Sequence, residues 1–280
     1  EYLAAYDGVR RASRLELYNV WAHTYALLAL ARAFREDQDH RFREAALLHL
    51  AHLQRYETYL GGWNYYDFVH GLQTPSMAPT SFGTAAGLEA LHEARAAGIE
   101  IPEGLLKRAL ARLREMRLPD GAFLYGSDMK YAPRHPANLI KGSLGRTQSG
   151  HYALQLWKTP EIGPAEIRAG LDVFFQEHRF LEIGRKRQFP HEGWYMTAGY
   201  YYYFGHYYAA KLIERLPEAG LLKTRLAEQI LPLQEPDGSW WDFKMWDYHK
   251  AYGTAYALMA LLRCGGDQST SYLDQSRSTR

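Results

Sequence analysis

The sequence predicts an all-α protein in which about five to six helix pairs stack side by side and close into an α/α toroid. Apolar residues recur at helical spacing in long segments rich in Ala, Leu, Glu and Arg. A junction of one design also recurs about every sixty residues along the chain. Such helix pairs cannot bury both faces alone, and closing the ring removes the exposed ends. An open solenoid is the competing arrangement.

The expected helices fall into two alternating sets. One set has heavily charged faces and belongs on the outside, at about residues 41–56, 103–117, 164–178 and 220–234. The other set has small and aromatic residues with few charges and belongs in the interior, at about residues 19–35, 80–97, 146–157, 198–215 and 250–263. We therefore expect a single toroid domain over residues 1–265 and a polar tail over residues 266–280.

The clearest junction is found at residues 234–240, which read QEPDGSW. Pro stops the preceding helix, Asp-Gly makes a tight turn, and the Trp is expected to dock on the helix end. Weaker copies pair Gln54 with residues 62–63 and Gln176 with residues 193–194, and a degenerate copy runs over residues 116–123. The junction therefore predicts an internal repeat.

Composition and charge exclude several classes of function. The net charge is only +2 and no stripe of basic residues is present, so nucleic acid is not an expected partner. The single cysteine, Cys264, excludes an internal disulfide framework and a zinc site built from several cysteines. No run of eighteen apolar residues occurs, so we expect a soluble chain without a transmembrane segment. The chain begins at Glu1, and an exported protein whose leader has been removed fits as well as an intracellular one, so the compartment and the oligomeric state stay open.

The aromatic content of 14%, with 22 Tyr and 7 Trp, predicts that rings line a cavity or surface. The first candidate site lies in residues 191–208, where Tyr202 and His206 are candidate catalytic acids or bases. Trp194 and Tyr201 are candidate substrate-binding residues in the same segment, because rings bind apolar groups and stabilise cations. The alternative is that the tyrosines fill the interior, with their hydroxyl groups bonded to the backbone.

A second candidate site follows the clearest junction, at residues 240–249. Asp247 and His249 are candidate catalytic residues that could shuttle protons, and Trp246 is a candidate substrate-binding residue. Together with Asp242 they could also bind a divalent ion, but nothing further in the sequence indicates one, so we predict no metal site and no cofactor. The alternative is that Asp247 caps the next helix while His249 faces solvent.

Two further segments supply candidate binding residues. A Gly-containing loop over residues 138–148 is expected to open a helix and to present Lys141 and Arg146 to a phosphate, sulfate or carboxylate, with His151 one turn into the helix. The alternative is an exposed loop in which Thr147 caps the helix. Trp63 and Tyr66 occupy the equivalent of the second candidate site in an earlier repeat, so their role is either binding or structural.

The junction QEPDGSW and the stretch YGTAYAL at residues 252–258 resemble the repeats and inner helices of squalene-hopene cyclases, and they are similar to those of prenyltransferase β subunits. Residues 193–209, GWYMTAGYYYYFGHYYA, resemble the aromatic segment near the end of bacterial triterpene cyclases. The resemblance extends from about Tyr18 to Cys264. It implies the toroid fold and an apolar ligand, and a fold of this kind hosts many functions.

The sequence departs from these families at the residues that carry their chemistry. The Asp-x-Asp-Asp motif of class II terpene cyclases occurs nowhere in the chain. The positions that match the zinc ligands of protein prenyltransferases are Ser149, His151 and Gly253, which cannot form that three-ligand site. No motif therefore fixes a reaction type, or decides whether the protein is an enzyme.

Three hypotheses follow for function. The leading one is a terpene cyclase-like or prenyltransferase-like toroid that binds an apolar, isoprenoid-class small molecule in a central aromatic-lined cavity. The second is a polysaccharide-active toroid of the lyase kind, in which Tyr and His act beside Arg146 or Lys141 on a glycan. The third is a non-catalytic binding or scaffold domain.

Overall fold

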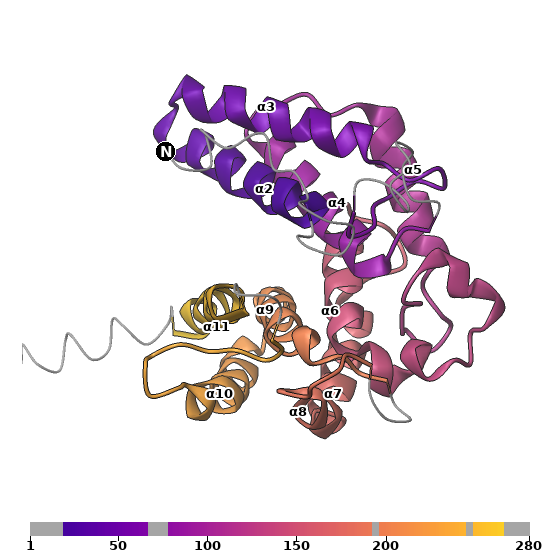
Figure 1. Cartoon of the computed structure of the whole chain (residues 1–280), viewed down its shortest axis with the longest axis vertical. Helices are drawn as coiled ribbons and strands as arrows, with labels where there is room; N and C mark the ends of the chain where they lie inside the picture. The colour runs from indigo at the N-terminus through magenta and orange to yellow at the C-terminus, as the bar shows by residue number, and fades with distance from the viewer. Residues whose placement is uncertain (1–18, 67–77, 192–195, 245–248, 266–280) are drawn as a thin grey trace, which may run out of the picture. The chain divides into compact units, whose positions relative to one another are not determined.

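The computed structural model of the chain describes residues 19–66, 78–191, 196–244 and 249–265, and the regular elements in this part are helices (Figure 1). Within these ranges no β-strand is formed, and two isolated bridges are the only β-type pairing. The prediction of an all-α protein is confirmed.

The predicted alternation of two helix sets is also found. The set with few charges comprises α2 (Asn19–Asp37), α4 (Ser81–Ala96), α6 (Ile140–Leu156), α9 (Tyr202–Ile213) and α11 (His249–Gly265). The charged set comprises α3 (His40–Arg55), α5 (Glu103–Glu115), α7 (Pro164–Gln176) and α10 (Ala219–Ile230). The sequence patterns did not predict the short helix α8 (Arg179–Gly184) or the 3-10 turns η1 (Ser127–Tyr131), η2 (Pro136–Asn138), η3 (Gly199–Tyr201) and η4 (Leu231–Leu233).

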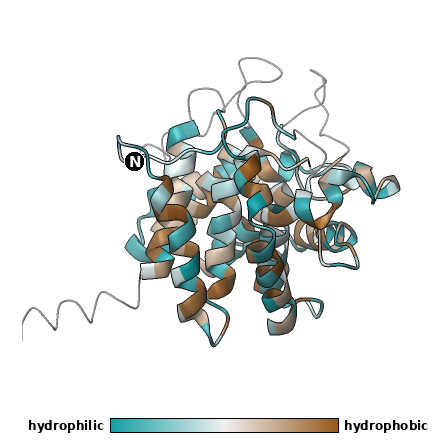
Figure 2. Ribbon diagram, turned by 90° about the horizontal axis from the view of Figure 1, so that it is seen from below, coloured by the Kyte–Doolittle hydropathy of each residue, from teal (hydrophilic) through white to brown (hydrophobic). Residues whose placement is uncertain are grey.

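The two sets differ in burial as the patterns predict, except at α11. Of the residues of α11, only Gly253, Tyr256, Ala257 and Ala260 are buried, and Leu258 and Leu262 are exposed. Every residue of α9 is buried, and so are nearly all residues of α4. In contrast, α5 buries one face, formed by Leu105, Leu106, Ala109 and Leu113. Figure 2 shows hydrophobic and hydrophilic residues on the same helices, which is the pattern of amphipathic packing.

Three helix boundaries differ from the prediction by four residues or more: the start of α6, the start of α9 and the end of α10. Helix α6 begins at Ile140, so the expected loop over residues 138–148 is helical from there on, and Thr147 lies inside the helix instead of capping it. The glycines that suggested a loop serve close packing: a Cβ atom on Gly205 of α9 would lie 2.8 Å from the Cα atom of Gly145. Glycine is used here because it lets two helix backbones approach each other.

The chain divides into two compact units, each described by itself. Unit 1 comprises Glu1–Leu139 and Ala153–Ile162, and unit 2 comprises Ile140–Tyr152 and Gly163–Arg280. In unit 1, α2 packs against α3 and α4, and α4 packs against α5. In unit 2, α9 packs against α7, α8, α10 and α11, while α10 also packs against α11.

The repeated junction has the same turn wherever the structure describes it. Backbone N–H groups of Thr58, Leu118 and Glu235 donate to the carbonyl groups four residues on, at 2.9, 2.7 and 2.8 Å. The glycine three residues on has positive φ each time, at Gly61 (85°), Gly121 (88°) and Gly238 (81°), as this turn requires. The predicted repeat of about sixty residues is therefore confirmed at three junctions, and the copy at residues 193–194 lies outside the described residues.

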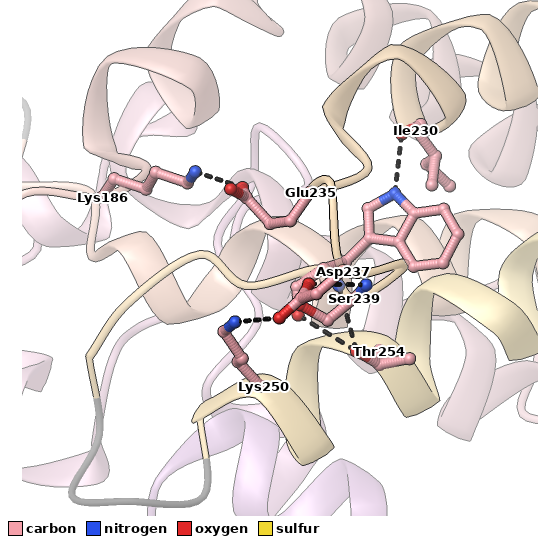
Figure 3. A network of polar contacts seen from close by, with 8 residues as sticks. Lys186, Ile230, Glu235, Asp237, Ser239, Lys250 and Thr254 are labelled. Atoms are coloured by element: carbon pink, nitrogen blue, oxygen red, sulfur yellow. Dashed lines mark hydrogen bonds and ion pairs between the residues drawn. The ribbon is translucent and has the colours of Figure 1, made fainter.

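The tryptophan of the junction docks as predicted. Trp240 Nε1 donates to the carbonyl group of Ile230 at 3.0 Å, and Trp240 N donates to Thr254 Oγ1 at 3.0 Å (Figure 3). Trp63 makes equivalent bonds in unit 1, to Leu53 O at 2.8 Å and to Thr84 Oγ1 at 3.2 Å. Each Trp thus joins the end of a charged helix to the next helix along the chain. Around the Trp240 turn, Asp237 pairs with Lys250 and Glu235 pairs with Lys186 (Figure 3).

Candidate functional site

The candidate catalytic residues His206 and Tyr202 lie inside the packed core of unit 2. Both side chains are fully buried, and their rings stack at 4.4 Å. Tyr202 donates its hydroxyl group to the carbonyl of Gln229 at 3.2 Å, and burial is the largest of the causes that raise its pKa. Burial lowers the pKa of His206 to about 4, so the ring is neutral near pH 7. These contacts match the structural alternative that the sequence left open for the tyrosine run.

The candidate binding residues of α6 are also inside unit 2. Arg146 is fully buried, donates to the carbonyl of Gly142 at 2.9 Å, and lies 5.2 Å from the ring of Tyr201, which is itself buried. His151 is buried against Gly170 of α7. Lys141 is half-buried, with Nζ 4.6 Å from the ring of Phe180. Because Arg146 lies in the second turn of a helix, it does not form the anion-binding loop that was predicted.

The remaining candidates separate into three groups. Trp63 is fully buried at its junction, so its ring is not open to a substrate. Tyr66 and His249 are half-buried, and Trp241 packs its ring against His249 at 5.5 Å. Trp194, Trp246 and Asp247 lie outside the described residues.

Asp242 proves more unusual than the sequence indicated. It follows Trp240 by two residues and is fully buried, where its Oδ2 accepts from the backbone N–H of Tyr203 at 3.1 Å at the start of α9. Burial is the main cause that raises the pKa of this carboxyl group to about 7, and it outweighs the opposing backbone hydrogen bonds. The geometry gives Asp242 the role of anchoring the loop after Trp240 to the first turn of α9.

Sequence reasoning missed a buried lysine among the tyrosines of unit 2. Lys211 donates to the hydroxyl group of Tyr207 at 3.0 Å, and its Nζ lies 4.3 Å from the ring centre of Tyr152 and 4.7 Å from that of Tyr207. In the sequence Lys211 follows Ala209 and Ala210 near the end of the expected helix, where a lysine usually faces solvent, so the pattern gave no sign of its burial. A cation placed among ring faces is stabilised by their quadrupoles.

A second aromatic cluster lies in unit 1 and is more accessible. Phe82, buried at the start of α4, forms its centre, and the rings of Trp21, Tyr65 and Tyr125 lie 5.9, 5.3 and 5.4 Å from it. Tyr25 stacks on Trp21 at 5.3 Å, with an interplanar angle of 12°. All four residues other than Phe82 are half-buried. We call these five residues the unit 1 aromatic cluster.

The backbone fixes the unit 1 aromatic cluster in place. Val20 N donates to the carbonyl of Tyr65 at 3.3 Å, and Ser81 N donates to the carbonyl of Tyr125 at 3.1 Å. The hydroxyl groups of Tyr65 and Tyr125 bond to each other at 2.6 Å. Tyr65 lies two residues after Trp63, and Tyr125 lies two residues after Phe123, the aromatic residue at the same place in the degenerate junction. The repeat could therefore have indicated this pair.

The comparisons with known proteins leave the family open. No protein-family model matches the chain, and no curated protein matches it. Among the described residues, no helix has both the length and the apolar character needed to cross a membrane.

Proposed function

We propose that the chain is an α/α toroid of the squalene-hopene cyclase and prenyltransferase class, and that it binds an apolar, isoprenoid-class ligand on the unit 1 aromatic cluster. The observation that carries the proposal is the set of three half-buried rings around the buried Phe82, with the half-buried ring of Tyr25 stacked on Trp21. Aromatic faces that stay partly open on a rigid scaffold favour apolar groups, because binding removes their area from water. The proposal concerns binding and assigns no reaction.

The repeat supports the architectural part of this proposal. Three junctions share one turn, two of them dock a Trp in the same way, and helices of the set with few charges pack against each other within each unit, α2 against α4 and α9 against α11. Stacked pairs with one register curve in one direction. Small-angle scattering of the purified chain tests closure, since a ring gives a smaller radius of gyration than an open solenoid of the same length.

The ligand is tested by native mass spectrometry of the purified protein, followed by solvent extraction after denaturation. We expect a lipid or isoprenoid to leave with the protein, and Trp21→Ala to carry less of it. The control is Tyr59→Ala, which removes an aromatic ring that is 74% exposed and is not part of the cluster. Equal ligand content in both variants would refute the assignment to the unit 1 aromatic cluster.

The polysaccharide hypothesis is the other outcome that this experiment can reveal. It relied on Arg146 beside the substrate, and the fully buried guanidinium group of Arg146 gives that idea little support. A clean apo mass, together with a gain in thermal stability on adding an acidic oligosaccharide, would favour it over the isoprenoid proposal.

A further inference from the structure

Two residues of the first candidate segment, residues 191–208, are half-buried and bonded to each other in unit 2. His191 Nε2 is 2.9 Å from the hydroxyl oxygen of Tyr200, and the two ring planes are nearly perpendicular at 86°. Both residues keep part of their surface exposed, whereas Tyr202 and His206 of the same segment are fully buried. The pair is therefore more accessible to a reactant than the two residues that the sequence indicated.

The other ring nitrogen of His191 decides where the protons of the pair lie. His191 Nδ1 is 2.8 Å from the carbonyl oxygen of Met196, and a carbonyl can only accept, so Nδ1 carries a proton. The neutral ring then has its lone pair on Nε2, and the hydroxyl group of Tyr200 donates to it. A base that is fixed in one tautomer thus accepts the phenolic hydrogen bond.

This hydrogen bond differs from those of two neighbouring tyrosines. Tyr202 donates to the carbonyl of Gln229 at 3.2 Å, and Tyr252 donates to the carbonyl of Tyr200 at 3.1 Å. A carbonyl oxygen holds a hydroxyl group in place but does not take its proton. An imidazole nitrogen can take it, so Tyr200 has a base at the distance that proton transfer requires.

Close packing fixes the backbone at Tyr200. The residue before it, Gly199, is enclosed: a Cβ atom there would lie 2.8 Å from the carbonyl oxygen of Gly184 and 3.0 Å from that of Asp242. On the other side, the carbonyl of Tyr200 accepts the bond from Tyr252. The phenol is therefore held on a rigid part of unit 2, as a reacting group must be.

The backbone that presents His191 is strained. His191 and Met196 have φ angles of 58° and 49°, in the left-handed region that residues with side chains rarely adopt. The bond from His191 Nδ1 joins these two residues. Strain of this kind is concentrated at functional sites, where it serves to hold a group in position. Residues 192–195, between them, lie outside the described residues and are no part of the site.

Aromatic rings border the phenol of Tyr200. The ring of Tyr201 lies 4.5 Å from it, and the half-buried ring of Phe243 lies 5.8 Å from it at 72°. Such rings favour an aryl group beside the reacting atoms. An aryl ester also suits a tyrosine nucleophile chemically, because the phenol that leaves is no more basic than the phenol that attacks.

We propose that Tyr200 is a nucleophile, that His191 is its general base, and that the pair takes the acyl group of aryl esters. The oxygen of Tyr200 attacks the ester carbonyl carbon while its proton passes to His191 Nε2. The bond from that carbon to the leaving oxygen then breaks, and the proton goes to the departing phenol. Water cleaves the tyrosyl ester with His191 as base, which releases the acid and restores the hydroxyl group. The site lies in unit 2 and does not depend on the ligand proposed for unit 1.

The test incubates the full chain with p-nitrophenyl acetate and follows the initial acetylation of each tyrosine by peptide mass spectrometry. We expect Tyr200 to be acetylated about a hundredfold faster than Tyr131, although the side chain of Tyr131 is 86% exposed. His191→Gln keeps a donor for the Met196 carbonyl but has no base. It should slow the acetylation of Tyr200 by about a hundredfold and leave that of Tyr131 unchanged.

The pH dependence distinguishes a base from a histidine that only holds the loop. In the natural chain the rate at Tyr200 should become constant once the imidazole is neutral. A tyrosine without a base reacts as its phenolate, so the rate in His191→Gln should rise about tenfold per pH unit up to about pH 10. Parallel profiles in the two proteins would show that His191 takes no proton.

A second variant covers the case in which His191→Gln does not fold. Tyr200→Phe keeps the ring and should abolish the fast release of p-nitrophenolate, whereas its matched control, Tyr131→Phe, should keep it. The proposal is overturned if Tyr200 is acetylated no faster than Tyr131, if His191→Gln leaves the rate at Tyr200 unchanged, or if Tyr200→Phe retains the fast release.

Discussion

The aromatic residues of the two units have the same chemistry and opposite surroundings. In unit 2 the tyrosines of α9 are fully buried, and Tyr202, Tyr203, Tyr207 and Tyr208 pack ring against ring. In unit 1 the rings around Phe82 keep part of their surface open. In this chain the dense run of tyrosines in α9 therefore forms core, whereas Trp21, near the start of α2, and the tyrosines two residues after a junction stay half-buried.

The largest expected difference between the two units is in the free energy of unfolding that is lost when a ring is removed. Tyr207→Ala should lower the free energy of unfolding by about 3 to 5 kcal/mol, because it leaves a cavity among buried rings. Trp21→Ala, in the half-buried cluster of unit 1, should cost clearly less. Urea unfolding followed by circular dichroism measures both values. Equal losses would mean that the unit 1 cluster is core as well.

The second prediction concerns the pH dependence of stability, which should differ between the buried Asp242 of unit 2 and an exposed aspartate. The pKa of Asp242 is raised from 3.8 to about 7, so the folded state binds more protons than the unfolded state between these values, and stability falls as pH rises through that window. Asp242→Asn cannot ionise and still accepts from Tyr203 N. It should be more stable than the natural chain at pH 8 by about 2 to 4 kcal/mol, and similar to it near pH 4.

Asp237 is the control, because its effect on stability should change with pH in the opposite direction. Its hydrogen bonds to Lys250 and Ser239 hold its pKa below the ordinary value, so its contribution is present above pH 4 and is lost on acidification. Asp237→Asn should destabilise the chain at neutral pH, and the difference should vanish in acid. A parallel pH dependence in both variants would show that the burial of Asp242 has no effect on its titration.

The third prediction compares the loss of stability when one tyrosine hydroxyl group is removed from each unit. Tyr202→Phe removes the bond that the fully buried Tyr202 donates to the carbonyl of Gln229 and should cost about 1 to 2 kcal/mol. Tyr125→Phe removes the bond to Tyr65 at a half-buried position, where water can replace the hydroxyl group, and should cost less than about 1 kcal/mol. Thermal unfolding at constant pH gives the two differences. The comparison fails if Tyr125→Phe costs more than Tyr202→Phe.

Much of the fold could be predicted, because helical periodicity and the junction are local signals. The boundaries of α3 and α5 agree with the expected helices to within two residues, and Trp63 and Trp240 dock on helix ends as expected. The start of α6 could not be predicted, because its glycines are needed for contact with α9, which lies far along the chain. Local sequence does not distinguish a glycine in a loop from one in a helix contact.

The candidate sites were predicted less well, for a related reason. Residue type indicated chemistry at His206, Tyr202 and Arg146, but burial depends on packing between segments distant in the sequence. The partner of His206, His178, lies in the turn between α7 and α8, and the three rings around Phe82 come from one helix and two loops. Such convergence becomes visible only when the helices are in place.

The smallest effect concerns the lysine in the tyrosine core of unit 2. Lys211 has lost most of its hydration, and its contacts with Tyr207 and the ring of Tyr152 offset that loss. Lys211→Met fills the same volume without a charge, so the change in unfolding free energy should be below about 1 kcal/mol. Lys211→Ala is the control, and it should cost more because it leaves a cavity. If chemical unfolding shows a large loss of unfolding free energy for Lys211→Met, the charge itself stabilises the core. The tyrosines of unit 2 would then bind a cation as well as fill the interior.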